Sequence, residues 1–276
     1  MNDMHDIKPG QSIALLQELH ILTRDGKMNQ DSRRKLKQVN HLYQFIAPLL
    51  QSILQQRQDI QLVDHGAGKS YLGFILYDLF FKTLNTAAHI YCIESRDELV
   101  KHSQELAARL NFPGMSFIKL TVAESIHSSS LPDKVDIVTA LHACDTATDD
   151  AIRFALHKQA QFIVLVPCCQ AEMAAVLRKN KSEDMAKNAL TELWRHPIHT
   201  REFGSHLTNV LRCLQLEAHG YQVTVTELVG WEHSMKNELI IASYKNLPGN
   251  RARERLNTIL QTLGLEEMKA RFFVPG

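Results

Sequence analysis

The stretch QLVDHGAGKS, residues 61–70, decides the fold that this sequence predicts. Its apolar first half is typical of a short buried strand that ends at Asp64, and the apolar spacing of residues 71–81 predicts a helix directly after it. Gly66 and Gly68 let the chain turn tightly and approach a ligand without obstructing Cβ atoms. A strand, a glycine turn and a helix start with unpaired N–H groups together predict a nucleotide-type pocket.

The residues around the glycines argue against two common nucleotide motifs. A P-loop, G-x-x-x-x-G-K-[ST], needs its first glycine where Val63 stands, although Gly68, Lys69 and Ser70 match its end. A dinucleotide fingerprint, G-x-G-x-x-G or A, places the bulky Tyr71 at its last position, where close helix packing is obstructed. The pattern that is left after these exclusions is an acid, Asp64, two residues before G-x-G. The alternative to a ligand-binding loop is an ordinary tight turn.

A second strand is predicted at residues 88–93, and it ends at Glu94. In doubly wound sheets an acid at the end of the second strand can accept hydrogen bonds from the ribose hydroxyls of a nucleotide. Glu94 is therefore predicted to bind ribose. A helix-capping acid at a strand exit is the alternative.

Five more segments have the apolar pattern of strands, and helical patterns lie between most of them. The segments are residues 116–122, 135–141, 161–166, 222–228 and 238–244. Helical spacing also appears before the first strand, at residues 12–22 and 31–56, where Pro48 is expected to kink or interrupt the second helix. The predicted organisation is a helical N-terminal extension at residues 1–57, a core at 58–248 with a helical insertion at about 171–219, and a helical tail at 249–276.

These motifs resemble those of the class I S-adenosylmethionine-dependent methyltransferases. The acid and G-x-G of residues 64–68 resemble motif I of that family. The L-H-x-C-x-x-A-T-D that begins at Leu141 and the P-C-C that begins at Pro167 resemble a methyltransferase-like branch that includes tRNA 2′-O-methyltransferases acting on the acceptor stem. The chain departs from these patterns at Ser70, where many members carry a third glycine, and at Gln170, where relatives often carry histidine. The resemblance implies an α/β fold with a Rossmann-like seven-stranded methyltransferase sheet and antiparallel final strands.

The same resemblance implies S-adenosylmethionine as the cofactor. Residues just past the third strand often lie near the adenine in such proteins, although a plain loop is the alternative there. Lys69 is expected to bind the cofactor, and the alternative is that it is only a solvated charge at the start of the helix. The residues expected to bind the cofactor are Asp64, Gly66, Ala67, Gly68, Lys69, Glu94, Ala123, Glu124 and His142.

Reactive side chains follow the fourth and fifth strands, whose carboxyl ends should border one crevice. Methyl transfer is an in-line displacement, so the protein mainly has to align the acceptor with the methyl group. A general base is needed only if the acceptor must lose a proton, and His142 and Asp145 are the candidates. Cys168 and Cys169 are also predicted to border the acceptor, with small buried hydrophobic groups as the alternative. No metal site is predicted, because adjacent cysteines rarely reach one tetrahedral zinc ion together.

Composition limits the partners that the sequence predicts. The 276 residues are 45% hydrophobic and carry a formal net charge of +1, so no global field recruits nucleic acid. Residues 23–57 contain seven Lys or Arg against two Asp, a local excess that could meet RNA phosphates or form a solvated helix face. No apolar run reaches the roughly 18 residues of a membrane span. The polar start and five cysteines without disulfide-framework spacing fit a reducing cytoplasm.

The leading hypothesis is an S-adenosylmethionine-dependent methyltransferase with RNA, either tRNA or rRNA, as the candidate substrate. One alternative is a catalytically silent adaptor that keeps the cofactor pocket. The other is a nicotinamide-dependent oxidoreductase, against which Tyr71 argues. The sequence predicts neither the acceptor atom nor an oligomeric state.

Overall fold

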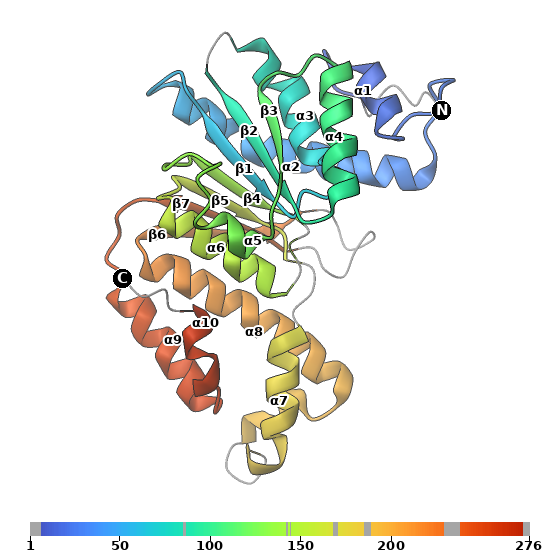
Figure 1. Ribbon diagram of the computed structural model, residues 1–276. Helices are drawn as coiled ribbons and strands as arrows, with labels where there is room; N and C mark the ends of the chain where they lie inside the picture. Colours follow the sequence, from blue (N-terminus) through green and yellow to red (C-terminus); the bar gives the residue numbers. More distant parts are fainter. Residues whose placement is uncertain are drawn as a thin grey trace.

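A mixed sheet forms the centre of the molecule (Figure 1). The structure, a computed structural model, describes residues 7–84, 87–141, 143, 145–167, 171–184, 189–228 and 238–272. In these parts of the chain seven strands stand in the order β3-β2-β1-β4-β5-β7-β6, and every neighbouring pair is parallel except the two that include β7. The strands are β1 (Gln61–His65), β2 (His89–Glu94), β3 (Met115–Lys119), β4 (Ile137–Ala140), β5 (Phe162–Leu165), β6 (Tyr221–Glu227) and β7 (Glu238–Tyr244). The predicted fold class is confirmed, including the helices that precede the sheet.

Helices cover both faces of the sheet, and several short 3-10 turns connect them. The α-helices are α1 (Ile13–Glu18), α2 (Gln30–Leu54), α3 (Tyr71–Leu79), α4 (Asp97–Arg109), α5 (Val122–Ser125), α6 (Thr146–His157), α7 (Ala171–Asp184), α8 (Pro197–Ala218), α9 (Asn250–Thr262) and α10 (Lys269–Phe272). The 3-10 turns are η2 (Phe81–Thr83), η3 (Ala189–Trp194) and η4 (Glu266–Met268).

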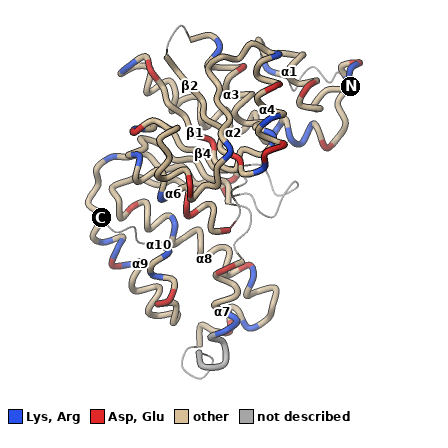
Figure 2. Tube along the Cα trace, in the orientation of Figure 1, with Lys and Arg blue, Asp and Glu red and all other residues tan. Residues whose placement is uncertain are grey.

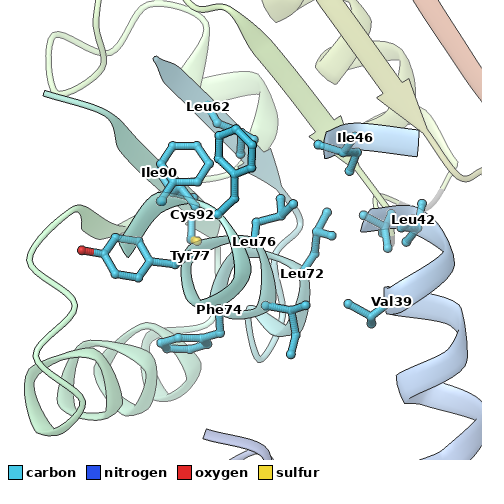
Figure 3. Close-up of a cluster of buried hydrophobic side chains, with 14 of the residues drawn as sticks. Val39, Leu42, Ile46, Leu62, Leu72, Phe74, Leu76, Tyr77, Ile90 and Cys92 are labelled. Atoms are coloured by element: carbon cyan, nitrogen blue, oxygen red, sulfur yellow. The ribbon is translucent and has the colours of Figure 1, made fainter. Parts of the chain in front are cut away.

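The two faces of the sheet have separate hydrophobic clusters because side chains alternate along each strand. Leu62 of β1 belongs to the cluster that includes α1, α2, α3 and α4, whereas Val63 belongs to the cluster of α5 and α6. In the first cluster Val39, Leu42 and Ile46 of α2 point toward α3 (Figure 3). The helices before β1 are thus packed into the core of the sheet.

A third hydrophobic cluster lies on the side of α8 that faces away from the sheet (Figure 1). Helices α7, α9 and α10 and the turn η3 surround it, and its largest member is the fully buried Trp194, whose ring stacks on Phe203 at 4.9 Å. The predicted helical tail is divided into α9, η4 and α10, and Gly264 after α9 has a left-handed φ of 63° that ends the first helix.

Two other expectations concern element boundaries: Pro48 does not interrupt its helix, and the third strand is shorter than predicted. Helix α2 is continuous through Pro48, which lies on its exposed side, while Leu42, Ile46 and Leu50 pack into the core. On that exposed side, water can satisfy the carbonyl that the proline leaves without an N–H partner. The third strand ends at Lys119 and does not continue to residue 122, because Thr121 and Glu124 form a capping box that begins α5.

The strand order fixes where a ligand can enter. Strand β1 pairs with β2 on one side and with β4 on the other, so the direction of the chain's progress across the sheet reverses between β1 and β4. In open α/β sheets the crevice at such a reversal, outside the carboxyl ends of the strands, is the usual binding site. Asp64, Cys92 and Thr139 lie side by side in the register at this end of the sheet.

Candidate functional site

The glycine turn between β1 and α3 is held against the end of β2 by backbone hydrogen bonds. The Ala67 N–H donates to the Ile93 carbonyl at 3.0 Å, and the Gly68 N–H donates to Glu94 Oε2 at 2.8 Å. Gly66 and Gly68 have φ values of 63° and 59°, which lie in the left-handed region that glycine adopts without steric penalty. The predicted glycine turn therefore exists, and the acid at the end of β2 lies directly beside it.

Glu94 is an almost buried carboxylate with a strong set of donors. Its side chain is 8% exposed, and Arg96 donates from its backbone N–H and its guanidinium as well as pairing with it ionically. Burial alone would raise the pKa of Glu94, but the hydrogen bonds from Arg96 and from the Gly68 N–H lower it to about 2. Glu94 is therefore ionised at neutral pH, and its carboxylate lies beside the crevice.

Glu94 lies in the wall of a cavity of about 540 Å³, which we call the Glu94 cavity. Its wall combines the glycine turn, the ends of β2 and β3 and the start of α6. The lining residues are Gly66, Gly68, Ile93, Glu94, Ser95, Arg96, Leu120, Thr121, Val122, Ala143 and Ala147. Apolar side chains beside one ionised acceptor suit a ligand with a flat apolar part and hydroxyl groups.

A second cavity of about 290 Å³, the Asp64 cavity, lies on the α2 side of the glycine turn. Gly66 and Gly68 line both cavities, so the two cavities share the glycine turn as a common wall. The lining residues are Lys35, Gln38, Val39, Asp64, Gly66, Ala67, Gly68, Lys69, Tyr71, Leu72 and Leu141. Helix α2 thus contributes to the wall of the site, a role that the sequence analysis did not predict.

Asp64 gives the second cavity an unusual acid. Its side chain is buried and accepts a hydrogen bond from Thr139 Oγ1 at 2.6 Å. Burial raises the pKa of Asp64 from about 3.8 to about 7, although the Thr139 hydrogen bond opposes that shift. Lys35 reaches the same cavity from α2, and its ammonium pairs with Asp31 at 2.7 Å. A ligand there would meet an acid that ionises near neutral pH and the cationic side chains of Lys35 and Lys69.

Apart from Asp145, the remaining predicted residues fall into three groups. Ala67 and Lys69 line the Asp64 cavity. Ala123 and Glu124 lie in α5 with exposed side chains, and the Glu124 carboxylate accepts a hydrogen bond from the Thr121 N–H. Neither residue lines the Glu94 cavity, whereas residues 120–122, just before them, are part of its wall. His142, Cys168 and Cys169 lie outside the described residues, as does Cys144.

Asp145 lies at the start of α6 with a φ of 51°, and its backbone is tied to α8. The Asp145 carbonyl accepts from Arg212 at 2.8 Å, and the same guanidinium donates to both oxygens of Asp149 at 2.6 and 3.1 Å. Arg212 is 0% exposed and the Asp149 side chain 3%, so this is a buried bidentate pair. Arg212 was missed from the sequence, because its partner is 63 residues away and only the helical pattern around it was visible.

The described residues contain no group of three or more His, Cys, Asp or Glu side chains placed to hold a metal ion. Among the same residues, none of the helices has the length and apolar character that a membrane crossing requires.

Comparison with known proteins gives one family match and distant relatives. A family model described as a methyltransferase domain matches residues 34–176, more than half of the chain. The chain is 24% identical over 236 residues to the glutathione S-transferase C-terminal domain-containing proteins of Bos taurus and Mus musculus. That match covers 79% of this chain but 34% of each relative, so the chain spans about a third of their length.

Solved structures with a similar arrangement include two methyltransferases. Magnesium protoporphyrin IX methyltransferase of Synechocystis, solved with bound SAH, is 14% identical with a TM-score of 0.46, and the match covers 84% of this chain and 95% of that one. Precorrin-6y C5,15-methyltransferase of Geobacter metallireducens is 19% identical with a TM-score of 0.42, covering 72% of this chain and 86% of that one.

Proposed function

The chain belongs to the family of methyltransferase domains, and from that premise we propose that it is an enzyme that uses S-adenosylmethionine as its methyl donor. The observation that carries the proposal is Glu94. An ionised acid at the end of β2 faces the glycine turn and lines a cavity large enough for a nucleoside. A carboxylate in this place can accept hydrogen bonds from both hydroxyls of a ribose, which is what the donor's adenosine offers.

The two adjacent cavities, which share the glycine turn, support a placement for the whole donor. The adenosine would occupy the Glu94 cavity, where Ile93, Leu120 and Val122 supply apolar contacts. The amino-acid end would occupy the Asp64 cavity, where the Asp64 carboxylate can meet an ammonium and Lys35 can meet a carboxylate.

The chain's own residues would act by positioning. When bound, S-adenosylmethionine supplies a methyl group on a positively charged sulfur. Leu141 lines the Asp64 cavity at the end of β4, so the segment that follows it, including His142, is the expected border of the acceptor. Holding the two reactants in line is the main contribution that such a site can make. We keep His142 and Asp145 as candidates for a general base, and Cys168 and Cys169 as further residues at the acceptor.

Isothermal titration of ligand-free protein with S-adenosylhomocysteine tests the donor proposal directly. We expect measurable binding, and an absence of heat would remove the proposal. Replacing Glu94 by alanine should weaken binding by about 1–3 kcal/mol, because charged hydrogen bonds to the ribose are lost. The matched control is Glu105→Ala, which removes the same charge from an exposed position of α4. Equal affinities of the two variants would exclude Glu94 as a ribose ligand.

We propose RNA as the substrate class, with transfer taking place in the cytoplasm, where the free thiols of Cys92 and Cys213 stay reduced. Support comes from α2, where the exposed Arg34, Lys35 and Lys37 lie on the helix that walls the Asp64 cavity. Elsewhere Lys and Arg are interspersed with Asp and Glu along the chain (Figure 2).

Incubation with radiolabelled donor and fractionated cell extract should label tRNA or rRNA. Label in protein alone would contradict the RNA proposal, and donor binding without any transfer would indicate a silent adaptor.

A further inference from the structure

The Glu94 carboxylate already has a full set of hydrogen-bond donors within the protein. Oε2 accepts from the Gly68 N–H at 2.8 Å and from Arg96 Nη2 at 3.2 Å. Oε1 accepts from the Arg96 backbone N–H at 3.0 Å, from Arg96 Nε at 2.9 Å and from Ser95 Oγ at 3.4 Å. A carboxylate offers about four lone-pair positions, so these donors fill it.

This arrangement conflicts with ribose binding unless one donor leaves. The two backbone N–H groups belong to the glycine turn and to the start of α4, so they cannot move away from Glu94 without a change in the fold. The guanidinium of Arg96 is different, because its side chain is 59% exposed and can rotate into water. Its two bonds go to different oxygens of Glu94, one each, as the two hydroxyls of a cis-diol would.

We propose that the Arg96 side chain caps Glu94 in the ligand-free protein and that the ribose of the incoming donor displaces it. This inference rests on the proposed function, since it assigns Glu94 to the ribose. Arg96 then acts as a competitor for the carboxylate, and the affinity for the donor includes the work of breaking this ion pair. An exposed guanidinium makes that work small enough for a ligand to overcome. Glu98, whose charge also favours the protonated form of Arg96, is the nearby acid toward which the released side chain can turn.

Removing the cap should strengthen ligand binding, which is the opposite of what a ligand-contacting arginine would do. We expect Arg96→Ala to bind S-adenosylhomocysteine about two- to fivefold more tightly than the unmodified chain, as measured by titration calorimetry. S-adenosylhomocysteine is the suitable probe, because at pH 7 its amino and carboxyl charges cancel and a change in the protein's net charge affects it little. The matched control is Lys101→Ala, which removes an exposed charge of the same sign from α4 where it pairs with Asp97.

A double-mutant cycle identifies the partner of Arg96. In a Glu94→Gln background, Arg96→Ala should leave the affinity unchanged, because the ion pair is already broken. Unchanged or weaker binding by Arg96→Ala in the otherwise native chain would overturn the cap. The same gain in Lys101→Ala would also overturn it, since it would then be a general effect of charge.

A second measurement keeps the cap testable if S-adenosylhomocysteine binds to no variant, an outcome that would refute the donor proposal alone. The Nε proton of Arg96 should exchange slowly in nuclear magnetic resonance spectra of the ligand-free protein, because it donates to a nearly buried carboxylate. It should lose that protection in Glu94→Gln. An Nε proton that exchanges in the native chain as fast as in this variant would refute the cap itself.

Discussion

Ser70 occupies a position where the backbone favours glycine, and its side chain compensates. Its φ of 56° and ψ of 30° lie in the left-handed region, which costs a residue with a Cβ about 1 kcal/mol or more. The hydroxyl is buried and hydrogen-bonded to the Cys92 thiol. The departure from a third glycine, visible in the sequence, thus coincides with strain in the turn.

This explanation predicts an order of stability among two Ser70 variants. Ser70→Ala should be destabilised by about 0.5–1.5 kcal/mol, because it loses the hydrogen bond and keeps the strained backbone. Ser70→Gly loses the same hydrogen bond but relieves the backbone strain. Its free energy of unfolding should therefore be closer to that of the native chain than the free energy of Ser70→Ala is. Urea denaturation measures both. A glycine variant less stable than the alanine variant would show that the turn is not strained at this residue.

Asp64 should make stability depend on pH in a direction opposite to most aspartates. Its pKa is raised by burial to about 7, so the folded protein holds a proton there that the unfolded chain releases near 3.8. The stabilising contribution of the protonated Asp64 is complete below pH 3.8 and is lost as the pH rises through about 7. Asp64→Asn cannot lose that proton, so its stability relative to the native chain should increase by about 2–4 kcal/mol between pH 4 and pH 8.

The comparison of variants at each pH removes the effect of the neighbouring His65. Burial lowers the pKa of His65 to about 3, so that residue makes the protein less stable as the pH falls from 6.5 toward 3. Both chains contain His65, and its contribution cancels in the difference between them. Denaturation curves at several pH values give that difference, and a constant offset would mean that Asp64 is ionised throughout.

At the scale of elements, α2 is the part of the site that the sequence did not assign. Its residues Lys35 and Gln38 line the Asp64 cavity, although the basic excess of residues 23–57 predicted only contact with RNA phosphates or a solvated helix face. The apolar spacing showed which face of α2 is buried. It could not show that the helix crosses the carboxyl end of β1, because that depends on long-range packing against α3.

Lys35 should affect only ligands that carry the amino-acid arm. We expect Lys35→Ala to weaken S-adenosylhomocysteine binding about three- to tenfold, because an ion pair with the ligand's carboxylate is lost. Binding of 5′-methylthioadenosine, which has the same nucleoside but lacks that arm, should be unchanged. Lys37→Ala is the matched control, since Lys37 is exposed on the same helix and is not part of the cavity wall. Equal losses for both ligands would refute the placement of the arm beside α2.

The strands were predictable from the sequence because each is a short apolar run, and parallel order then brings their ends together. That reasoning placed Asp64, the glycines and Glu94 correctly at one edge without any knowledge of contacts. It did not find the start of α5, although the capping pair Thr121 and Glu124 is a local signal. It also could not find Arg96 as a partner of Glu94, because helix-start charges usually face solvent.

For the molecule as a whole, the hydrophobic clusters do not follow the domain boundary predicted at residue 57. One cluster contains buried residues of α1 and α2 together with those of α3 and of strands β1 to β3. The methyltransferase family match also begins inside α2, at residue 34. The helices before the sheet therefore complete one face of it, which a pattern of helical spacing read segment by segment could not reveal.

We therefore predict that a chain starting at residue 58 does not fold cooperatively. Burial of six large apolar side chains of α2 is lost, which amounts to roughly 9–18 kcal/mol and equals or exceeds the total stability of a typical domain. They are Leu36, Val39, Leu42, Ile46, Leu50 and Ile53. Thermal melting followed by circular dichroism should show a sharp transition for the full chain and for a control that lacks only residues 1–6, but none for the shortened chain. Adding residues 7–57 as a separate peptide should restore part of the transition. A cooperative melt of the shortened chain within a few degrees of the full chain would instead make residue 57 a true domain boundary, and α2 would then be an appendage that the sheet does not need.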